Sequence, residues 1–308
     1  MTDFRSGFVA VVGRPNVGKS TLINAFLGQK VAAVSPRPQT TRQRQLGILT
    51  LPHSQLVFVD TPGLHIPRHK LGHYLNQEAL QALDGVDVLL FIVDASVAPT
   101  AEDRLVANNL EKLPGRSPAI LVLNKSDLLT ADGLRLAEVA YRNIAPHAAA
   151  VLSISALQHQ HLTDLLEILV SYLPVRPAEY PEEQITDLYE REIAADLIRE
   201  ACLVKLRDEV PHSLAVQINE FTERSNGAVF ISATVYVERD SQKGIVIGQG
   251  GKMLKEIGMA ARREIESMGG HPAFLELRVK VLKHWRNDET AMRRFGYKLK
   301  KMAGVKSR

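Results

Sequence analysis

Cysteine is nearly absent from this sequence, since Cys202 is the only one among 308 residues. A single thiol can form neither an internal disulfide nor a zinc cluster, which excludes a disulfide-stapled secreted scaffold and favours a reducing compartment. Long apolar runs are missing too, because the most apolar stretch, residues 86–95, is short and carries two aspartates. The apolar stretch 8–12 ends at once in Gly-Arg-Pro, so we predict no signal peptide. These absences predict a cytoplasmic protein without membrane spans.

Charge is distributed unevenly along a composition that is otherwise ordinary for a globular protein, with 45% hydrophobic and 23% charged residues. Residues 1–183 hold 16 basic against 17 acidic side chains, a net charge of −1, whereas residues 184–308 hold 22 against 17, a net charge of +5. From residue 278 onward the count is 11 against 2, a net charge of +9. The second part is therefore expected to meet a polyanionic partner.

A proline-rich segment separates the two parts. Residues 174–183 contain three prolines, which prevent helix continuation and favour an extended spacer. Because 308 residues exceed what one core usually holds, we predict two domains, residues 1–173 and 184–308, joined by this linker. The alternative is an ordinary loop inside one large domain.

Short apolar runs alternate with amphipathic stretches in the first part. The pattern is typical of buried parallel strands and covering helices, so we predict a doubly wound α/β domain. Asp84, Asp87 and Asp94 are interpreted as solubilising groups at strand ends. The expected strands are residues 8–12, 55–60, 86–94, 119–123 and 148–154, and the expected helices are residues 20–27, 71–83, 101–113 and 162–173.

A glycine-rich loop follows the first expected strand directly. Residues 13–20, Gly-Arg-Pro-Asn-Val-Gly-Lys-Ser, match the phosphate-binding pattern G-x-x-x-x-G-K-[ST]. Glycines allow backbone N–H groups to surround phosphates, and the helix N-terminus adds a favourable dipole. Lys19 is expected at the β- and γ-phosphates, and the Ser20 hydroxyl is expected to ligate Mg²⁺. The alternative, a glycine-rich loop by chance, is disfavoured by its place between strand and helix.

Two further motifs follow strands in the expected order. Asp60-Thr61-Pro62-Gly63 places a carboxylate within reach of the metal and a glycine N–H near a γ-phosphate, so it can distinguish triphosphate from diphosphate. Asn124-Lys125-Ser126-Asp127 supplies a carboxylate that accepts from N1–H and the 2-amino group of guanine, two donors that adenine lacks. A buried Asp127 would be left unpaired by adenine.

These motifs together predict a site for GTP and GDP. The expected nucleotide-binding residues are Gly13, Arg14, Pro15, Asn16, Val17, Gly18, Lys19, Ser20, Thr21, Asp60, Thr61, Pro62, Gly63, Asn124, Lys125, Asp127, Ser155 and Ala156.

The order and spacing of the motifs resemble the TrmE-Era-EngA-like GTPases. The resemblance implies that residues 38–42 are the first switch segment, which from composition alone is part of a polar, mobile loop over residues 35–45. It implies that Thr41 joins Ser20 and Asp60 at Mg²⁺, and that Asn16 binds potassium. The residues expected to act in hydrolysis are Lys19, Thr41, Gly63 and Asn16. Leu64 stands where Ras-like GTPases carry a glutamine that orients water.

The second part is predicted to be an α+β domain. We expect helices over residues 188–206 and 253–267 and strands over residues 214–221, 229–237 and 275–281. A Gly-Gln-Gly-Gly sequence opens the second helix, where backbone and lysines can approach a nucleic-acid phosphate. This arrangement resembles a type II KH domain, whose G-x-x-G loop clamps single-stranded RNA. The expected RNA-binding residues are Ile247, Gly248, Gln249, Gly250, Gly251, Lys252 and Lys255.

A GTPase domain followed by one KH domain resembles the Era family along the whole chain. The resemblance implies binding to the 3′ end of 16S rRNA, a role in rRNA processing and 30S subunit assembly, peripheral contact with the inner membrane and a monomeric state. A regulatory GTPase that docks on protein or membrane is the alternative. Residues 286–308 are expected to form a basic helix and tail, in which the neighbouring aromatic side chains either stack on bases or pack in a core.

Overall fold

The computed structural model describes residues 3–35, 37, 40–113 and 117–297. Its first part is built on a six-stranded sheet with the strand order β2-β3-β1-β4-β5-β6. Apart from β2–β3, the strand pairs of this sheet are parallel. The strands are β1 (Arg5–Val12), β2 (Gln45–Leu51), β3 (Ser54–Asp60), β4 (Val88–Asp94), β5 (Ala119–Asn124) and β6 (Ala150–Ser153).

The edge strand β2 was not predicted, and it adds one antiparallel pair to the sheet. β2 pairs with β3 in antiparallel fashion, from Gln45 opposite Asp60 to Leu51 opposite Ser54. Only two residues connect the strands, and so short a connection can join only antiparallel neighbours. The pattern of β2 was missed because Gln45 and Gly47 interrupt its apolar character.

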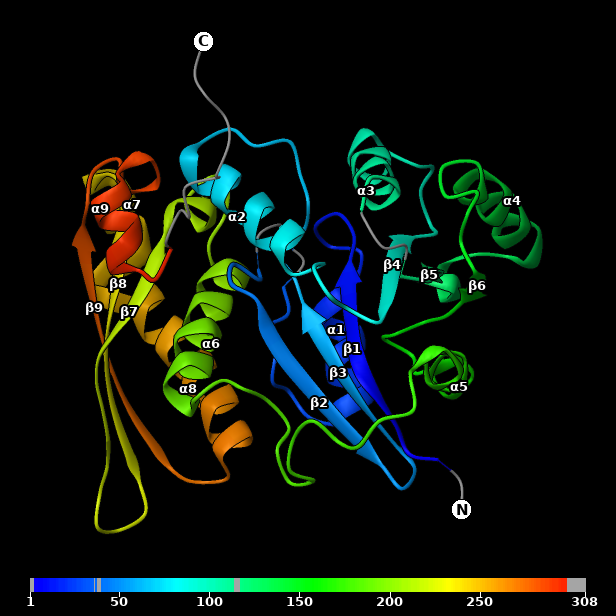
Figure 1. Cartoon of the computed structure of the whole chain (residues 1–308). Coiled ribbons are helices and arrows are strands. Elements are labelled where there is room, and N and C mark those ends of the chain that lie inside the picture. Colours follow the sequence, from blue (N-terminus) through cyan, green and yellow to red (C-terminus); the bar gives the residue numbers. More distant parts are fainter. Residues whose placement is uncertain (1–2, 36, 38–39, 114–116, 298–308) are drawn as a thin grey trace.

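Helices cover both faces of this sheet, as the doubly wound prediction requires (Figure 1). One apolar cluster packs α1 and α5 against the strands, and a second packs α2, α3 and α4 against the other face. The expected helices were found, together with α4, which was not predicted. The helices are α1 (Lys19–Leu27), α2 (Lys70–Gln81), α3 (Ala101–Glu111), α4 (Ala131–Arg142) and α5 (Leu162–Tyr172).

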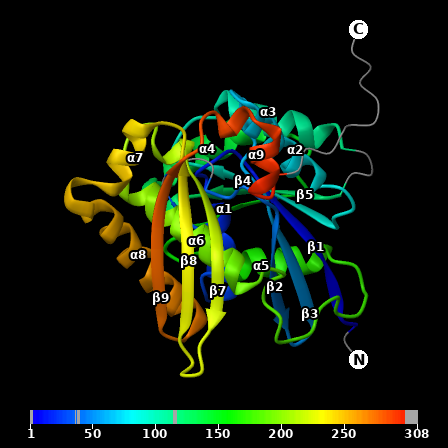
Figure 2. The same cartoon turned by 90° about the vertical axis from the view of Figure 1, so that its left-hand side faces the viewer.

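The second part is a three-stranded sheet, β7-β8-β9, with three of its helices packed on one face (Figure 2). β7 and β8 are antiparallel, whereas β8 and β9 are parallel, so β9 is an edge strand beside α8. Helices α6, α7 and α8 contribute to one apolar core with alternate residues of β8. The elements are α6 (Glu190–Lys205), β7 (Ala215–Glu223), β8 (Val229–Val237), α7 (Asp240–Ile247), α8 (Lys252–Gly269), β9 (Ala273–Val281) and α9 (Glu289–Arg294).

The proline-rich segment 174–183 has neither helix nor strand, but it is not a free spacer. Ser6 Oγ donates a hydrogen bond to the Pro177 carbonyl at 2.6 Å. Gln55 Nε2 donates to the Tyr180 carbonyl at 2.9 Å. The segment is therefore held along the first sheet, and the predicted domain limits on either side of it stay a prediction.

The aromatic residues near the C-terminus pack between the two parts. Trp285 and Tyr297 are buried in a cluster with Leu71 and Tyr74 of α2, and Trp285 Nε1 donates to the Ser213 carbonyl at 2.7 Å. Core packing is therefore the correct alternative for these two rings. Helix α9 covers only part of the expected basic helix, and the lysines beyond residue 297 lie outside the described residues. No helix in the described ranges has the length and apolar character needed to cross a bilayer.

Candidate functional site

The predicted nucleotide motifs meet at one edge of the six-stranded sheet. The loop 13–18 follows β1, Asp60 ends β3, and Asn124 ends β5. Because these three strands are parallel within the sheet, their carboxyl ends lie together, which is where doubly wound sheets bind ligands.

Lys19 is held inside the phosphate-binding loop. Its Nζ donates to the carbonyls of Gly13 at 3.2 Å and Arg14 at 3.0 Å, and the side chain is nearly buried. Burial lowers the pKa of Lys19 to about 8, although the nearby Asp60 carboxylate opposes this change. Gly18 directly precedes α1 with φ of 103°, and an added Cβ there would lie 2.2 Å from Asn124 Nδ2. The loop therefore requires glycine and presents a desolvated ammonium at the helix N-terminus.

Three oxygen-bearing side chains converge beside Lys19. Ser20 Oγ lies 3.0 Å from Thr41 Oγ1, and both hydroxyls donate to Asp60 Oδ2, at 2.9 and 3.1 Å. Asp60 Oδ1 is buried and has no hydrogen-bond partner among the described residues, and burial raises the pKa of this carboxyl. A carboxylate oxygen without a partner, next to two hydroxyls, fits the oxygen preference of Mg²⁺.

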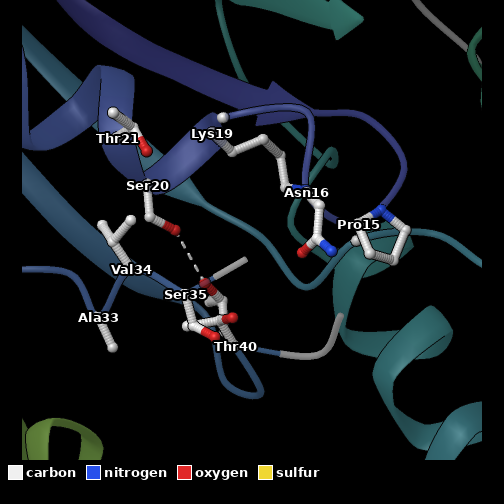
Figure 3. A pocket seen from close by; sticks show the side chains of 12 residues that line it. Pro15, Asn16, Lys19, Ser20, Thr21, Ala33, Val34, Ser35 and Thr40 are labelled. Carbon is white, nitrogen blue, oxygen red and sulfur yellow. Dashed lines mark hydrogen bonds between the residues drawn. The ribbon is translucent and has the colours of Figure 1, made fainter. Parts of the chain in front are cut away.

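A small cavity of about 50 Å³ lies over these groups (Figure 3). Figure 3 shows the side chain of Ser20 pointing toward the segment that carries Ser35 and Thr40. Residues 33–35 line this cavity and were not predicted, because their sequence carries no motif. The cavity is lined by Pro15, Asn16, Gly18, Lys19, Ser20, Thr21, Ala33, Val34, Ser35, Thr40, Thr41 and Gly63.

The D-x-x-G segment lies against the phosphate-binding loop. An added Cβ at Gly63 would lie 2.6 Å from the backbone nitrogen of Pro15, so this approach requires glycine. The Leu64 N–H donates to the Gly13 carbonyl at 3.3 Å, and the Leu64 side chain is buried. Thr61 Oγ1 donates to the Val11 carbonyl at 2.8 Å. Leu64 therefore cannot orient a water molecule, as its position in the sequence predicted.

The predicted guanine-recognition residues form a second group. Asn124 Nδ2 donates to the Val17 carbonyl at 2.7 Å, and Asn124 Oδ1 accepts from the Ala156 N–H at 3.0 Å. Asn124 thus ties three loops together. The Ala156 N–H is engaged by this contact, and Ser155 Oγ accepts from the N–H of Gln158 at 3.1 Å. Asp127 is exposed, so the protein itself does not desolvate its carboxylate.

Asp94 lies at the candidate site, where the sequence interpretation did not place it. It is buried at the end of β4, where Lys125 Nζ donates to its Oδ2 at 2.6 Å and Arg14 lies 3.7 Å away. Although burial acts to raise the pKa of Asp94, hydrogen bonds from Lys125 and Ser96 hold it below the ordinary value. Its interpretation as a solubilising group was wrong. The signal was its place at the carboxyl end of a strand, at the same edge as the other motifs.

The segment around Thr41 is anchored to the second part of the chain. Arg42 Nη1 donates to the Leu214 carbonyl at 2.8 Å, and the side chain is buried over the ring of Trp285. Arg37 Nη2 donates to the Leu206 carbonyl, also at 2.8 Å. The described residues of the expected loop 35–45 thus make specific contacts, and Gln45 belongs to β2. Pro38 and Gln39 of the expected switch segment lie outside the described residues.

A salt-bridge cluster precedes this segment. Lys30 Nζ lies 2.7 Å from Glu200 of α6 and 2.8 Å from Glu264 of α8. The other oxygen of Glu200 accepts from the Val34 N–H at 3.1 Å. The loop over the nucleotide site therefore contacts two helices of the second part, including the helix that begins at the G-x-x-G loop.

The predicted RNA-binding residues surround the junction of α7 and α8. Gly248, Gly250 and Gly251 have φ of 72°, 59° and 79°, the left-handed region that favours glycine. An added Cβ at Gly250 would meet nothing within 4 Å. Ile247 ends α7, and the side chains of Gln249, Lys252 and Lys255 are exposed. Backbone and ammonium groups are therefore accessible together at this loop.

A groove of about 380 Å³ extends from this loop between α8 and the edge strand β9. Its walls combine apolar side chains with cationic ones, which suits the stacking of bases above a charged backbone. Most of these residues were missed because they come from a helix and a strand with no motif. The groove is lined by Gly251, Leu254, Lys255, Gly258, Met259, Arg262, Phe274, Leu275 and Leu277.

The fold and the two sites define a P-loop GTPase joined to a KH domain. Residues 8–125 match the family model of the 50S ribosome-binding GTPases, and residues 209–286 match that of the KH domain. The chain is 43% identical to GTPase Era of Ruminiclostridium cellulolyticum and 44% identical to GTPase Era of Lacticaseibacillus paracasei. In both cases the match covers 97% of this chain and 99% of the relative.

Two solved structures are similar over 96% of this chain and their whole length, each at 40% identity and a TM-score of 0.91. One is Era with MgGDPNP and nucleotides 1506–1542 of 16S ribosomal RNA, and the other is an Aquifex aeolicus Era variant with GDP and AlF4⁻. The chain belongs to the Era GTPase family, and it hydrolyses GTP.

Proposed function

We propose that this chain is a GTP-hydrolysing switch that binds 16S rRNA near its 3′ end through the KH domain. In this proposal it acts in the cytoplasm, in rRNA processing and 30S subunit assembly. The observation that carries the proposal is the α8–β9 groove, which begins at an exposed G-x-x-G loop with Lys252 and Lys255 beside it. The solved relative with nucleotides 1506–1542 of 16S ribosomal RNA supports the choice of RNA.

At the nucleotide site, the chain's own residues position the triphosphate. Lys19 lies at the helix N-terminus, where its ammonium can leave the two loop carbonyls for phosphate oxygens. Ser20, Thr41 and Asp60 would hold Mg²⁺, which supplies neutralisation of phosphate charge when it is bound. The N–H of Gly63 is the contact proposed for the γ-phosphate, because the segment already lies against the phosphate-binding loop.

Asp127 gives the site its preference for guanine in this proposal. Its exposed carboxylate is free to accept from N1–H and the 2-amino group of the base, and the seated base would desolvate these bonds. Asn124 supports this residue from behind by linking its loop to the phosphate-binding loop. Adenine would leave the carboxylate without donors.

Contacts of the switch segment provide the link from nucleotide to RNA. Thr41 lies at the metal-binding group, and the adjacent Arg42 is bonded to Leu214 at the start of the KH sheet. A displacement of Thr41 on loss of the γ-phosphate would therefore displace the contact between Arg42 and Leu214 as well. The affinity of the groove for RNA is thus proposed to depend on which nucleotide is bound.

RNA crosslinking and sequencing test the proposal, with the chain loaded with a GTP analogue or with GDP. We expect 3′-terminal 16S rRNA fragments, recovered in amounts that depend on the nucleotide. Gly250→Asp, which adds negative charge where a phosphate should lie, is expected to abolish recovery.

Gly85→Asp is the matched control for this variant. Gly85 is an exposed glycine between α2 and β4, with φ of 74° and open space around an added Cβ. Recovery of no RNA above background would favour a protein- or membrane-docking GTPase. Undiminished recovery with Gly250→Asp would contradict the clamp.

Potassium is proposed to assist hydrolysis through Asn16. This residue has φ of 65° and lines the phosphate cavity, next to the glycine of the D-x-x-G segment. GTP turnover should be faster in KCl than in NaCl at equal ionic strength, and Asn16→Ala should remove the difference. Equal turnover in the two salts with the unaltered chain would eliminate the role of potassium. The peripheral membrane contact and the monomeric state expected from the family stay predictions.

A further inference from the structure

An aromatic pair lies at the far end of the groove from the glycine loop. Phe230 of β8 and Phe274 of β9 are direct neighbours in the parallel register, with ring centroids 5.8 Å apart and an angle of 19° between the rings. The adjacent β8 residues Val229 and Ile231 are buried in the core, so the alternation of the strand turns Phe230 to the other face. Phe274 is 57% exposed.

A guanidinium group lies over both rings. The Cζ atom of Arg224 is 5.1 Å from the ring centroid of Phe230 and 5.7 Å from that of Phe274. A single exposed phenylalanine is ordinary on a protein surface. The two nearly parallel rings and the guanidinium group bring aromatic faces and a positive charge together, and nucleobases stack on both aromatic rings and guanidinium planes.

The aromatic pair is continuous with the groove. Phe274 lines it together with Arg262, whereas Gly251 lines its opposite end. Gly251, directly before α8, and Arg262 within it are eleven positions apart, which corresponds to about 16 Å along the helix. A KH clamp holds about four nucleotides. A longer strand must leave the groove, and at this end the exposed ring is in its path.

We propose that Phe274, supported by Phe230 and Arg224, is a stacking site for one base of single-stranded RNA that leaves the α8–β9 groove. The site rests on the proposed RNA-binding function and extends its footprint beyond the four-nucleotide clamp. Because each base has an aromatic face, the site recognises RNA without strong preference for one base. Its contribution depends on RNA length, which distinguishes it from a contact inside the clamp.

Binding to RNA oligonucleotides of increasing length tests this site. Oligonucleotides from the 3′ end of 16S rRNA are lengthened from four to eight nucleotides, in one series at the 5′ end and in another at the 3′ end. In one series, affinity for the unaltered chain should rise about five- to a hundredfold at a single added nucleotide. Phe274→Ala should lose this step, which is measured for each variant relative to its own affinity for the four-nucleotide RNA.

Conservative variants separate stacking from simple apolar contact. Phe274→Tyr should keep the step, Phe274→Leu should lose most of it, and Arg224→Gln should reduce it. An equal step in Phe274→Ala or Phe274→Leu and the unaltered chain would overturn the stacking site. If Gly250→Asp still abolishes binding in that case, the RNA clamp stands without it. If the unaltered chain binds no RNA, both proposals fall.

Discussion

The two candidate binding regions of this molecule carry lysines in opposite environments. Lys19 of the nucleotide site is only 6% exposed and is held by two backbone carbonyls, whereas Lys252 and Lys255 beside the groove are exposed. A buried, oriented cation suits a small ligand of one geometry, and salt screens it weakly. Exposed cations suit a polymer whose phosphates are interchangeable, and salt weakens their contribution. The environment of the lysine thus reflects the ligand it is proposed to meet.

Removal of the buried cation should give the largest effect. Lys19→Met deletes the charged partner of the phosphates inside a desolvated loop, which is expected to cost about 2–5 kcal/mol of nucleotide binding, or about thirtyfold to several thousandfold in Kd. Calorimetric titration with GTP measures this loss. Lys255→Met is the matched control. It should leave GTP affinity unchanged and weaken the binding of RNA. A loss of GTP affinity below about threefold in Lys19→Met would contradict the stated difference between the buried and the exposed lysines.

A pH dependence should follow from the burial of Lys19. Its pKa of about 8 is lowered by burial, and an adjacent triphosphate should raise it, so nucleotide binding takes up a proton above about pH 8. GTP affinity should therefore fall as pH rises above 8, by up to about tenfold per pH unit. Titrations between pH 7.5 and 8.8 in buffers of different ionisation enthalpy measure the uptake. Lys19→Met should show none, and uptake in that variant would assign the proton elsewhere.

Without nucleotide, the same group should affect stability in the opposite sense. A lowered lysine pKa means that the unfolded chain binds more protons between about pH 8 and 10.5, so the contribution of Lys19 to the free energy of unfolding rises with pH across this window. Below about pH 8, the free-energy cost of burying the charged Lys19 side chain lowers the stability of the folded chain in full. Denaturant titrations of the unaltered chain and Lys19→Met at pH 7.5 and 9.5 should converge as pH rises, and a constant difference would contradict this linkage.

Neutralising the exposed lysines should reduce the salt dependence of RNA binding and leave the shape of the groove unchanged. Each phosphate neutralised on a single strand contributes about 0.7 to the slope of log affinity against log salt concentration. The double variant Lys252→Gln, Lys255→Gln should reduce this slope for RNA by about 1.4 and leave GTP affinity unchanged. Filter binding at several KCl concentrations measures it. An unchanged slope would mean that neither lysine lies at a phosphate.

The smallest effect is expected at Asp94. Asp94→Asn keeps the shape of the side chain but removes the charge that orients Lys125 and Arg14, so GTP affinity should fall about fivefold, equivalent to about 1 kcal/mol. Asp87→Asn is the control, because Asp87 precedes the same strand and lies at the amino edge of the sheet. Equal effects of the two changes would point to general loss of stability.

Local motifs were predictable because their geometry is encoded over a few residues. The phosphate-binding loop needs glycine at positive φ and a following helix, and both requirements are visible around Gly18. The G-x-x-G loop is equally local, with glycines at positive φ between α7 and α8. Residue roles at both loops remain predictions until the variants above are measured.

Other features depend on elements distant in sequence. Asp94 looked like a solvated strand end until the fold placed Lys125 against it. Strand β2 was not predicted because Gln45 and Gly47 interrupt its apolar pattern, and the strand is defined by its pairing with β3. The groove residues Met259 and Phe274 carry no motif, because only the packing of α8 beside β9 brings them together.

By itself, the amino-acid sequence determined the two loops from which the ligand classes are predicted, since phosphate loops and glycine clamps are built from the backbone of a few consecutive residues. Only the tertiary structure decided which charges are buried, which aromatic rings join the core and which remain exposed, and how the segment around Thr41 reaches the KH domain. The physical reason is that burial and long-range contact belong to the packed chain, in which residues more than a hundred positions apart desolvate and orient one another.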